Sequence, residues 1–138
     1  MGRILALDYG KKRTGIAVTD PLKIIATGIQ TINTENLFEF LSDYIKKETI
    51  EKIIIGLPMN LDGTPTDITA AVQHCIRRLK NTFPAIPIIP VDERYSSKMA
   101  SKAMLEMGMK KKDRQEKSNI DLVAATMMLQ DYLANNIL

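Results

Sequence analysis

Residues 3–19 read RILALDYGKKRTGIAVT, and this run carries the clearest structural signal in the chain. Its two apolar segments, Arg3–Asp8 and Thr14–Thr19, are separated by the short basic turn Lys11-Lys12-Arg13. Two segments of this kind joined by a polar turn are typical of a β-hairpin. We therefore predict a first strand that ends at Asp8, next to a turn rich in positive charge.

Beyond the hairpin, the pattern changes from strands to a helix and back. Ile24–Ile32 predicts a third strand, which completes a three-stranded antiparallel meander. Apolar residues then recur at helical spacing and predict an amphipathic helix from Thr34, as its N-cap, to about Glu48. Lys52–Gly56 is almost wholly apolar, which is typical of a strand buried on both faces of a sheet. Leu57–Pro65 is rich in Pro, Asn, Asp and Gly and predicts a loop.

The second half of the chain predicts one strand and three helices. The strand is Ile86–Val91, in which Pro87 and Pro90 favour an edge position. The helices are expected from Asp67 to Thr82, from Ser96 or Ser97 to Met107, and from Ser118 or Asn119 to about Asn135, with a cationic connector over Met109–Lys117. The predicted order, βββαβαβαα, is that of an α/β protein with a five-stranded mixed sheet flanked by helices.

The composition is that of one globular domain covering residues 1–138, with 45% hydrophobic and 25% charged residues. No run approaches the roughly 20 apolar residues of a membrane helix, and the start shows no signal-peptide pattern, so we expect a cytoplasmic protein without membrane contact. One cysteine and one histidine, Cys75 and His74, exclude an internal disulfide and a Cys/His zinc site. Any metal must therefore be held by oxygen ligands. The net charge of +3 weakly favours polyanionic partners.

Three acidic residues lie at predicted element ends: Asp8 at the end of the first strand, Glu93 at the end of the fifth, and Asp121 in the first turn of the last helix. If the first and fifth strands run parallel, Asp8 and Glu93 share the carboxyl edge of the sheet, where ligand sites gather in open α/β folds. Each acid also has a plainer interpretation. Asp8 fits an Asx turn, Glu93 fits an ion pair with Arg94, and Asp121 fits a capping box with Ser118.

Carboxylates that are brought together repel one another unless a cation neutralises them. Mg²⁺ prefers a few carboxylates together with water and phosphate oxygens, and a pair of such ions about 4 Å apart promotes hydrolysis of phosphodiesters. This chemistry needs no Ser, Cys or His nucleophile. The pattern makes Asp8, Glu93 and Asp121 candidate metal ligands and candidate catalytic residues of a hydrolase.

Four sequence blocks together resemble the YqgF/RuvX family. They are Leu7–Ala17, which reads LDYGKKRTGIA, Gly56–Thr64, which reads GLPMNLDGT, Val91–Arg94, which reads VDER, and Asp121–Ala125, which reads DLVAA. They occur in the family's order and span nearly the whole chain. The chain departs from the family pattern at Pro65-Thr66, where another glycine is common, and at Ser96-Ser97, where threonine is common. Both departures lie outside the acidic residues and bear on loop shape and substrate contact.

Members of this family are described as pre-16S ribosomal RNA nucleases or as Holliday junction resolvases, with a ribonuclease H-like fold shared with the RuvC resolvases. The resemblance implies that Asp8, Glu93 and Asp121 form an acidic triad that binds Mg²⁺ or Mn²⁺. It implies a nuclease acting on pre-ribosomal RNA in ribosome biogenesis, or on branched DNA, as a monomer or homodimer. The alternatives are a non-catalytic ribosome-assembly factor that binds nucleic acid, and an actin-like phosphotransferase. The latter is disfavoured because 138 residues provide only one of its two lobes.

Basic residues near the predicted acids are candidates for contacts with phosphates. The predicted nucleic-acid-binding residues are Lys11, Lys12, Arg13, Asn60, Arg94, Lys110, Lys111, Lys112 and Arg114. A solvated turn and a mobile connector would explain most of the same residues without a ligand. Asp62, which precedes Gly63, is open to two interpretations, a substrate contact or a turn.

Overall fold

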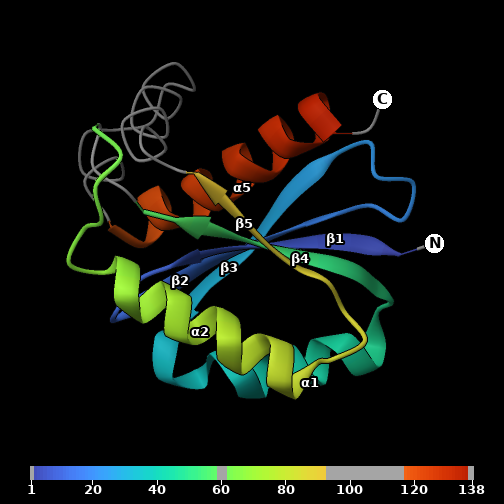
Figure 1. Ribbon diagram of the computed structural model, residues 1–138. Helices are drawn as coiled ribbons and strands as arrows, with labels where there is room; N and C mark the ends of the chain where they lie inside the picture. Colours follow the sequence, from blue (N-terminus) through green and yellow to red (C-terminus); the bar gives the residue numbers. More distant parts are fainter. Residues whose placement is uncertain (1, 59–61, 93–116, 137–138) are drawn as a thin grey trace.

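The computed structural model describes residues 2–58, 62–92 and 117–136. Three strands come first, a short 3-10 helix follows, and helices and strands then alternate (Figure 1). The bounds are β1 Arg3–Tyr9, β2 Arg13–Thr19, β3 Ala26–Asn33, η1 Thr34–Asn36, α1 Leu37–Lys47, β4 Ile50–Leu57, α2 Thr69–Thr82, β5 Ile88–Asp92 and α5 Lys117–Asn136. None of the helices in these ranges has both the length and the apolar character that crossing a membrane requires.

The strands form one mixed sheet in the order β3-β2-β1-β4-β5. β2 is antiparallel to both β1 and β3, whereas β4 is parallel to β1 and β5 is parallel to β4. The predicted meander followed by parallel strands is therefore confirmed. Because β1 and β5 run in the same direction, their carboxyl ends lie at the same edge of the sheet.

Helices cover both faces of the sheet, with α5 on one face and α1 and α2 on the other (Figure 1). Successive side chains of a strand point to opposite faces, so β1 contributes to both layers. Leu5 and Leu7 belong to the core under α1 and α2, while Ile4 and Ala6 pack in the core under α5. In β4, Ile53–Ile55 are wholly inaccessible to solvent, which confirms the prediction of a strand buried on both faces.

Strand β3 begins later than the sequence pattern predicts. Ile24 and Ile25, which the pattern assigns to the strand, are instead 64% and 60% exposed in the turn between β2 and β3. The Asp20 carboxylate holds this turn by accepting hydrogen bonds from the main-chain N–H groups of Ile24 and Ile25, at 2.7 and 2.8 Å. Such local hydrogen bonds compete with the strand ladder, which therefore starts only at Ala26.

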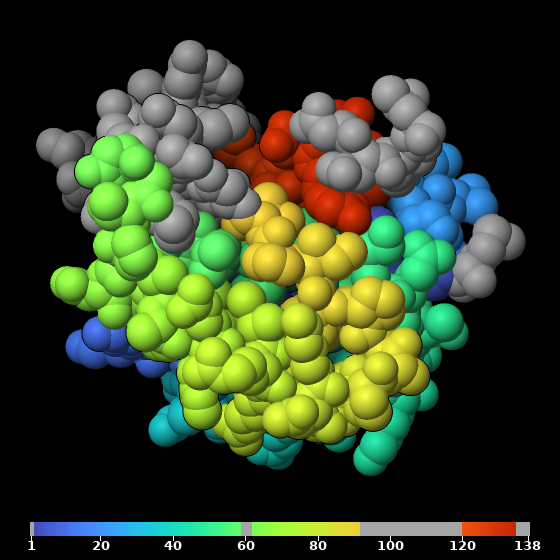
Figure 2. Space-filling model, in the orientation of Figure 1, coloured from blue at the N-terminus to red at the C-terminus, as the bar shows by residue number. Residues whose placement is uncertain are grey.

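Strand β5 lies at an edge of the sheet, as its prolines predict. Pro87 precedes the strand and Pro90 lies within it, and both are exposed. In Figure 2, the yellow atoms of this part of the chain are visible on the outer surface between α2 and α5. The strand begins at Ile88 rather than Ile86. The helix predicted to end at Met107 lies outside the described residues.

Helices α1, α2 and α5 begin at other residues than predicted; α5 begins at Lys117 rather than at Ser118 or Asn119. Thr34 is not the N-cap of a regular helix, because it is the first residue of η1 and α1 begins only at Leu37. Helix α2 begins at Thr69 rather than at Asp67. The buried hydroxyl of Thr69 donates a hydrogen bond to the Pro58 carbonyl oxygen at 2.6 Å. This bond ties the start of α2 to the segment that follows β4.

Candidate functional site

Asp8 and Asp121 lie on the same side of the sheet. Asp8 of β1 pairs directly with Gly15 of β2, and residues that oppose each other in an antiparallel pair point to the same face. Asp8 also alternates in phase with Ile4 and Ala6, which pack in the core under α5. The side chain of Asp8 is therefore on the face that α5 covers.

Gly15 allows α5 to approach the sheet at this point. A Cβ atom at position 15 would overlap the carbonyl oxygen of Asp121 and would lie 2.6 Å from its carbonyl carbon. No side chain fits between β2 and the helix here. Because Gly15 opposes Asp8, this contact brings two acids from opposite ends of the chain to one place.

Asp121 lies just beyond the first helical turn, whereas the sequence pattern placed it within that turn. Helix α5 begins at Lys117, so that Asp121 is its fifth residue. Ser118 is the second residue of the helix and is not the N-cap that a capping box requires. The capping-box interpretation of Asp121 is therefore wrong. The side chain of Asp121 is 18% exposed and interacts with a basic residue instead.

That basic residue is Arg13, at the start of β2. Its Nε lies 3.8 Å from Oδ2 of Asp121, which is close enough for an ion pair and too far for a hydrogen bond. The Nε atom is buried, and it has no hydrogen-bond partner in the described part of the chain. A buried donor left without a partner costs roughly 1–3 kcal/mol. An anionic oxygen, such as that of a phosphate, would remove this cost by accepting the hydrogen bond.

A cavity of about 320 Å³ opens beside Arg13 and Asp121. It is lined by Gly10, Lys11, Lys12, Arg13, Ile68 and Asp121. Lys11 and Lys12 are exposed at the tip of the turn between β1 and β2. The site thus combines two partly buried acidic residues with a basic rim that faces solvent, an arrangement suited to a phosphate chain.

Thr34 fixes the shape of this basic turn from a separate element, η1. Its hydroxyl donates to the Gly10 carbonyl oxygen at 2.6 Å, and its main-chain N–H donates to the Lys12 carbonyl oxygen at 2.9 Å. Because the hydroxyl proton of Thr34 is used for Gly10, the buried Thr14 hydroxyl donates to Thr34 Oγ1 over 2.9 Å. Sequence reasoning missed this role, since local patterns do not reveal contacts between residues 24 positions apart.

The structure thus brings Asp8, Asp121 and the turn Lys11-Lys12-Arg13 together. The other predicted site residues lie outside the described residues: Glu93, Asn60, Arg94, Lys110, Lys111, Lys112 and Arg114. Asp62 is described, and its Oδ1 accepts hydrogen bonds from the N–H and the hydroxyl of Thr64 at 2.9 and 2.6 Å. Gly63 takes a positive φ of 89° between them. The interpretation of Asp62-Gly63 as a turn is therefore confirmed.

The donor set of the site suits a hard divalent cation. Mg²⁺ is commonly held by one or two carboxylates together with water and substrate phosphates. Asp8 and Asp121 provide two carboxylates, and the adjacent cavity has room for water and phosphate oxygens. Within the described ranges, no group of three or more His, Cys, Asp or Glu side chains is placed to hold a metal. The third predicted ligand, Glu93, is not among these residues.

The single cysteine is remote from this site. Cys75 is buried in the core under α1 and α2, on the opposite face of the sheet from α5. Burial raises the pKa of its thiol to about 11, so the thiol is neutral at physiological pH and a poor nucleophile. The carboxylates of Asp8 and Asp121 therefore remain the candidate catalytic groups.

The fold belongs to the RuvC-like, ribonuclease H-like class. The solved structure of T. thermophilus RuvC in complex with Holliday junction substrate matches with a TM-score of 0.57, covering 99% of this chain and 97% of that chain. The two sequences are only 12% identical, so this likeness concerns the fold.

Within that class, the chain belongs to the RuvX family, whose profile, described as Holliday junction resolvase, matches residues 2–135. A relative from Flavobacterium psychrophilum is 50% identical over 137 residues, which cover 99% of this chain and 100% of the relative. A relative from Flavobacterium johnsoniae is 49% identical over 135 residues, 98% of each chain. Both relatives carry the provisional name pre-16S rRNA nuclease. The resemblance to the YqgF/RuvX family is thereby confirmed.

Proposed function

We propose that this chain is a metal-dependent nuclease that hydrolyses phosphodiester bonds of pre-16S ribosomal RNA and processes its 5′ end during ribosome biogenesis in the cytoplasm. The observation that carries the proposal is the contact at Gly15, which brings Asp121 beside Asp8 and next to a turn of three cations. The names of the two relatives support pre-16S RNA as the substrate.

Asp8, Asp121 and Glu93 are the proposed ligands of Mg²⁺ or Mn²⁺. Glu93 directly follows β5 in the sequence, and β5 ends at the same sheet edge as β1. The chemistry that such a cation supplies when bound is activation of the attacking water and neutralisation of charge on the leaving oxygen. The carboxylates hold the cation and keep the reacting phosphate beside them.

The basic turn is proposed to hold the RNA backbone. Lys11 and Lys12 are exposed and can each contact a phosphate of the chain. Arg13 offers its buried Nε to a phosphate oxygen next to Asp121, so it positions the phosphate at the carboxylates. Asn60, Arg94, Lys110, Lys111, Lys112 and Arg114 complete the proposed contact surface.

Cleavage of Holliday junctions is the second candidate function, favoured by the description of the family and by the fold shared with RuvC. A four-way junction is two-fold symmetric, so an enzyme that cuts both strands would act as a homodimer. Trimming of one RNA strand requires only a single copy. Substrate choice and oligomeric state therefore distinguish the two functions.

Cleavage assays with Asp8→Asn test the proposal. The chain is incubated with a 16S precursor fragment that carries a 5′ extension, and with a four-way DNA junction, in Mg²⁺, Mn²⁺ or EDTA. We expect metal-dependent removal of the RNA extension. Asp8→Asn keeps the size of the side chain and removes its charge, so we expect the rate to fall by roughly 100-fold or more, beyond the usual effect of outer-shell changes at metal sites.

Asp131→Asn is the matched control, because it removes an exposed acid from α5, the helix that also carries Asp121. This variant should cleave at the wild-type rate. If the unmodified chain cleaved the four-way DNA junction but not the RNA, the resolvase function would be favoured instead. Tight RNA binding without cleavage of either substrate, in any metal, would contradict a nuclease and favour a ribosome-assembly factor.

A further inference from the structure

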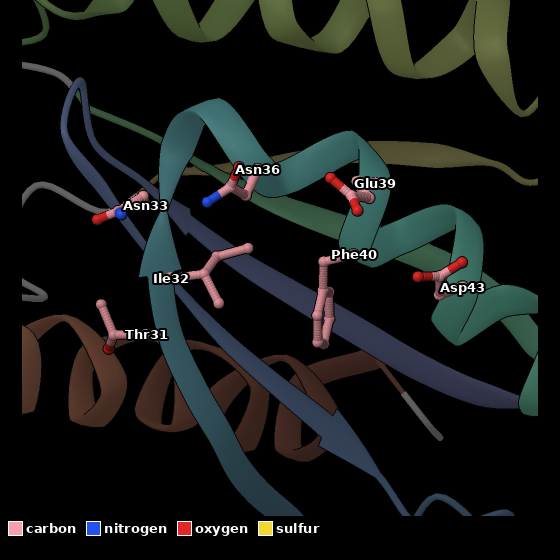
Figure 3. A pocket seen from close by; sticks show the side chains of 7 residues that line it. All are labelled: Thr31, Ile32, Asn33, Asn36, Glu39, Phe40 and Asp43. Carbon is pink, nitrogen blue, oxygen red and sulfur yellow. The ribbon is translucent and has the colours of Figure 1, made fainter.

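A groove runs between the outer edge of β3 and helix α1, away from Asp8 and Asp121. Its volume is about 640 Å³. Ile32 of β3 and Phe40 of α1 both point into the space between these two elements, and Asn36, Glu39 and Asp43 line the side that η1 and α1 provide (Figure 3). The carboxylates of Glu39 and Asp43 are exposed. The groove therefore has an apolar floor and one acidic wall.

The opposite wall is an open strand edge. β3 is the last strand on its side of the sheet, and in the described ranges no further strand pairs with it. Edge strands are usually protected by charged residues or proline, because their free N–H and C=O groups pair readily with other chains. The eight residues of β3, ATGIQTIN, include neither. This edge is thus suited to pairing with an added strand.

The acidic wall has a spacing that matches an extended chain. Glu39 and Asp43 are four residues apart in α1, which corresponds to a step of about 6 Å along the helix. Alternate side chains of an extended strand are about 6.6–6.8 Å apart and point to the same side. Lys and Arg are absent between Glu35 and Asp43. An extended segment with a basic residue at every second position would therefore meet successive acids.

We propose that this groove binds an extended basic segment of a partner protein, which adds to the edge of β3 and places Lys or Arg side chains against Glu39 and Asp43. A nucleic acid is a poor occupant, because the acids would repel its phosphates. A second copy of β3 is also a poor occupant, because that strand has no charged residue to offer to the acids. Strand addition with charge-complementary side chains is an established mode of peptide recognition.

The position of the groove separates the partner from the nucleic acid while keeping the two close. Asn33, at one end of the groove, pairs with Arg13 in the sheet. Asn33 also lines a second hollow together with Lys11, Lys12 and Glu35. A segment bound in the groove would end beside the basic turn without covering Asp8 or Asp121. This inference does not depend on the proposed nuclease activity.

Titration with model peptides, followed by NMR of the ¹⁵N-labelled chain, tests the proposal. The probe is a nine-residue peptide of alternating Lys and Val with blocked ends. We expect its binding to shift the amide signals of residues 30–33 and 36–43. A peptide of alternating Glu and Val should not bind. The Lys-Val peptide with N-methyl groups on alternate residues keeps its charges but loses half of its main-chain donors, so it should bind far more weakly.

The double variant Glu39→Gln/Asp43→Asn should weaken binding of the Lys-Val peptide by about 3- to 30-fold, since each exposed ion pair contributes up to a factor of about five. Asp67→Asn/Asp131→Asn, which removes two exposed acids elsewhere, should not weaken it. Equal binding of the N-methylated peptide, equal binding by the double variant, or no binding at all would overturn the proposal. Self-association through the same amides without peptide would assign the groove to a second copy and would also overturn it.

Discussion

At Gly15, the candidate site has no room for an added methyl group. In Gly15→Ala, the Cβ atom would overlap the Asp121 carbonyl oxygen, so either α5 or β2 must move. We expect the free energy of unfolding to fall by about 1–3 kcal/mol, as for other overpacked sites. Urea denaturation followed by circular dichroism measures this loss.

Gly28→Ala is the matched control for that experiment. Gly28 of β3 also faces α5, but its Cβ would meet side-chain atoms, Leu122 Cδ1 at 2.9 Å and Thr126 Oγ1 at 2.8 Å. Side chains can rotate away, whereas the main chain at Asp121 cannot. The loss of stability should therefore be smaller. Equal losses in the two variants would contradict the close contact between Gly15 and Asp121.

Thr34 acts on the site through the basic turn, and Thr34→Val tests this role. Valine preserves the shape of the side chain but removes the hydroxyl bonds to Gly10 and Thr14. With the turn less well fixed, we expect weaker binding of RNA. The slope of log affinity against log salt should fall by about 1 for each cation that no longer reaches a phosphate.

Thr34→Ser retains the hydroxyl and should restore both the affinity and the salt slope. A change in stability alone would not alter the number of phosphate contacts, so the slope separates a positioning role from a general loss of folding. If Thr34→Val binds RNA with the wild-type affinity and slope, the turn does not depend on this residue.

Among the elements, the turn between β2 and β3 depends on one carboxylate. Hydrogen bonds from main-chain N–H groups, above all that of Ile25, lower the pKa of Asp20 below its ordinary value of 3.8. The stabilisation by this carboxylate is therefore fully present above pH 3.8 and is lost as the pH falls through the lower pKa of the folded state.

A carboxyl NMR titration checks this prediction. The midpoint for Asp20 should lie below 3.8, and the amide signals of Ile24 and Ile25 should shift over the same pH range. In Asp20→Asn, those amides should not titrate in that range. A midpoint at or above 3.8 would show that the carboxylate does not hold the turn.

The elements themselves could be predicted from the sequence wherever burial imposed a regular pattern. The apolar runs of β1 and β4 are buried on both faces, so their composition reveals them directly. The prediction that the third strand begins at Ile24 was wrong. β-Branched residues such as Ile24 and Ile25 favour strands, but here the Asp20 carboxylate accepts hydrogen bonds from their N–H groups. The N-cap assigned to Thr34 was wrong for a similar reason, since its hydroxyl serves a distant turn.

For the whole molecule, the candidate site depends on how α5 packs across the sheet. Asp8 and Asp121 are predicted as site residues from their positions near the ends of elements and from the family resemblance, and their role stays a prediction. Their proximity could not be derived from local patterns, because it depends on the Gly15 contact between β2 and α5. Arg13 was predicted as a phosphate contact, but its ion pair with Asp121 also follows only from this packing.

The central claim is that folding gathers Asp8 and Asp121 into one site for a divalent cation. Titration of the ¹⁵N-labelled chain with Mn²⁺ tests it most directly, because the paramagnetic ion broadens the amide signals nearest to it. We predict that residues 8–10 and 121–122 broaden first, well below one equivalent of Mn²⁺, and that Asp8→Asn abolishes this effect. Broadening that begins elsewhere, or that is unchanged in Asp8→Asn, would contradict the claim.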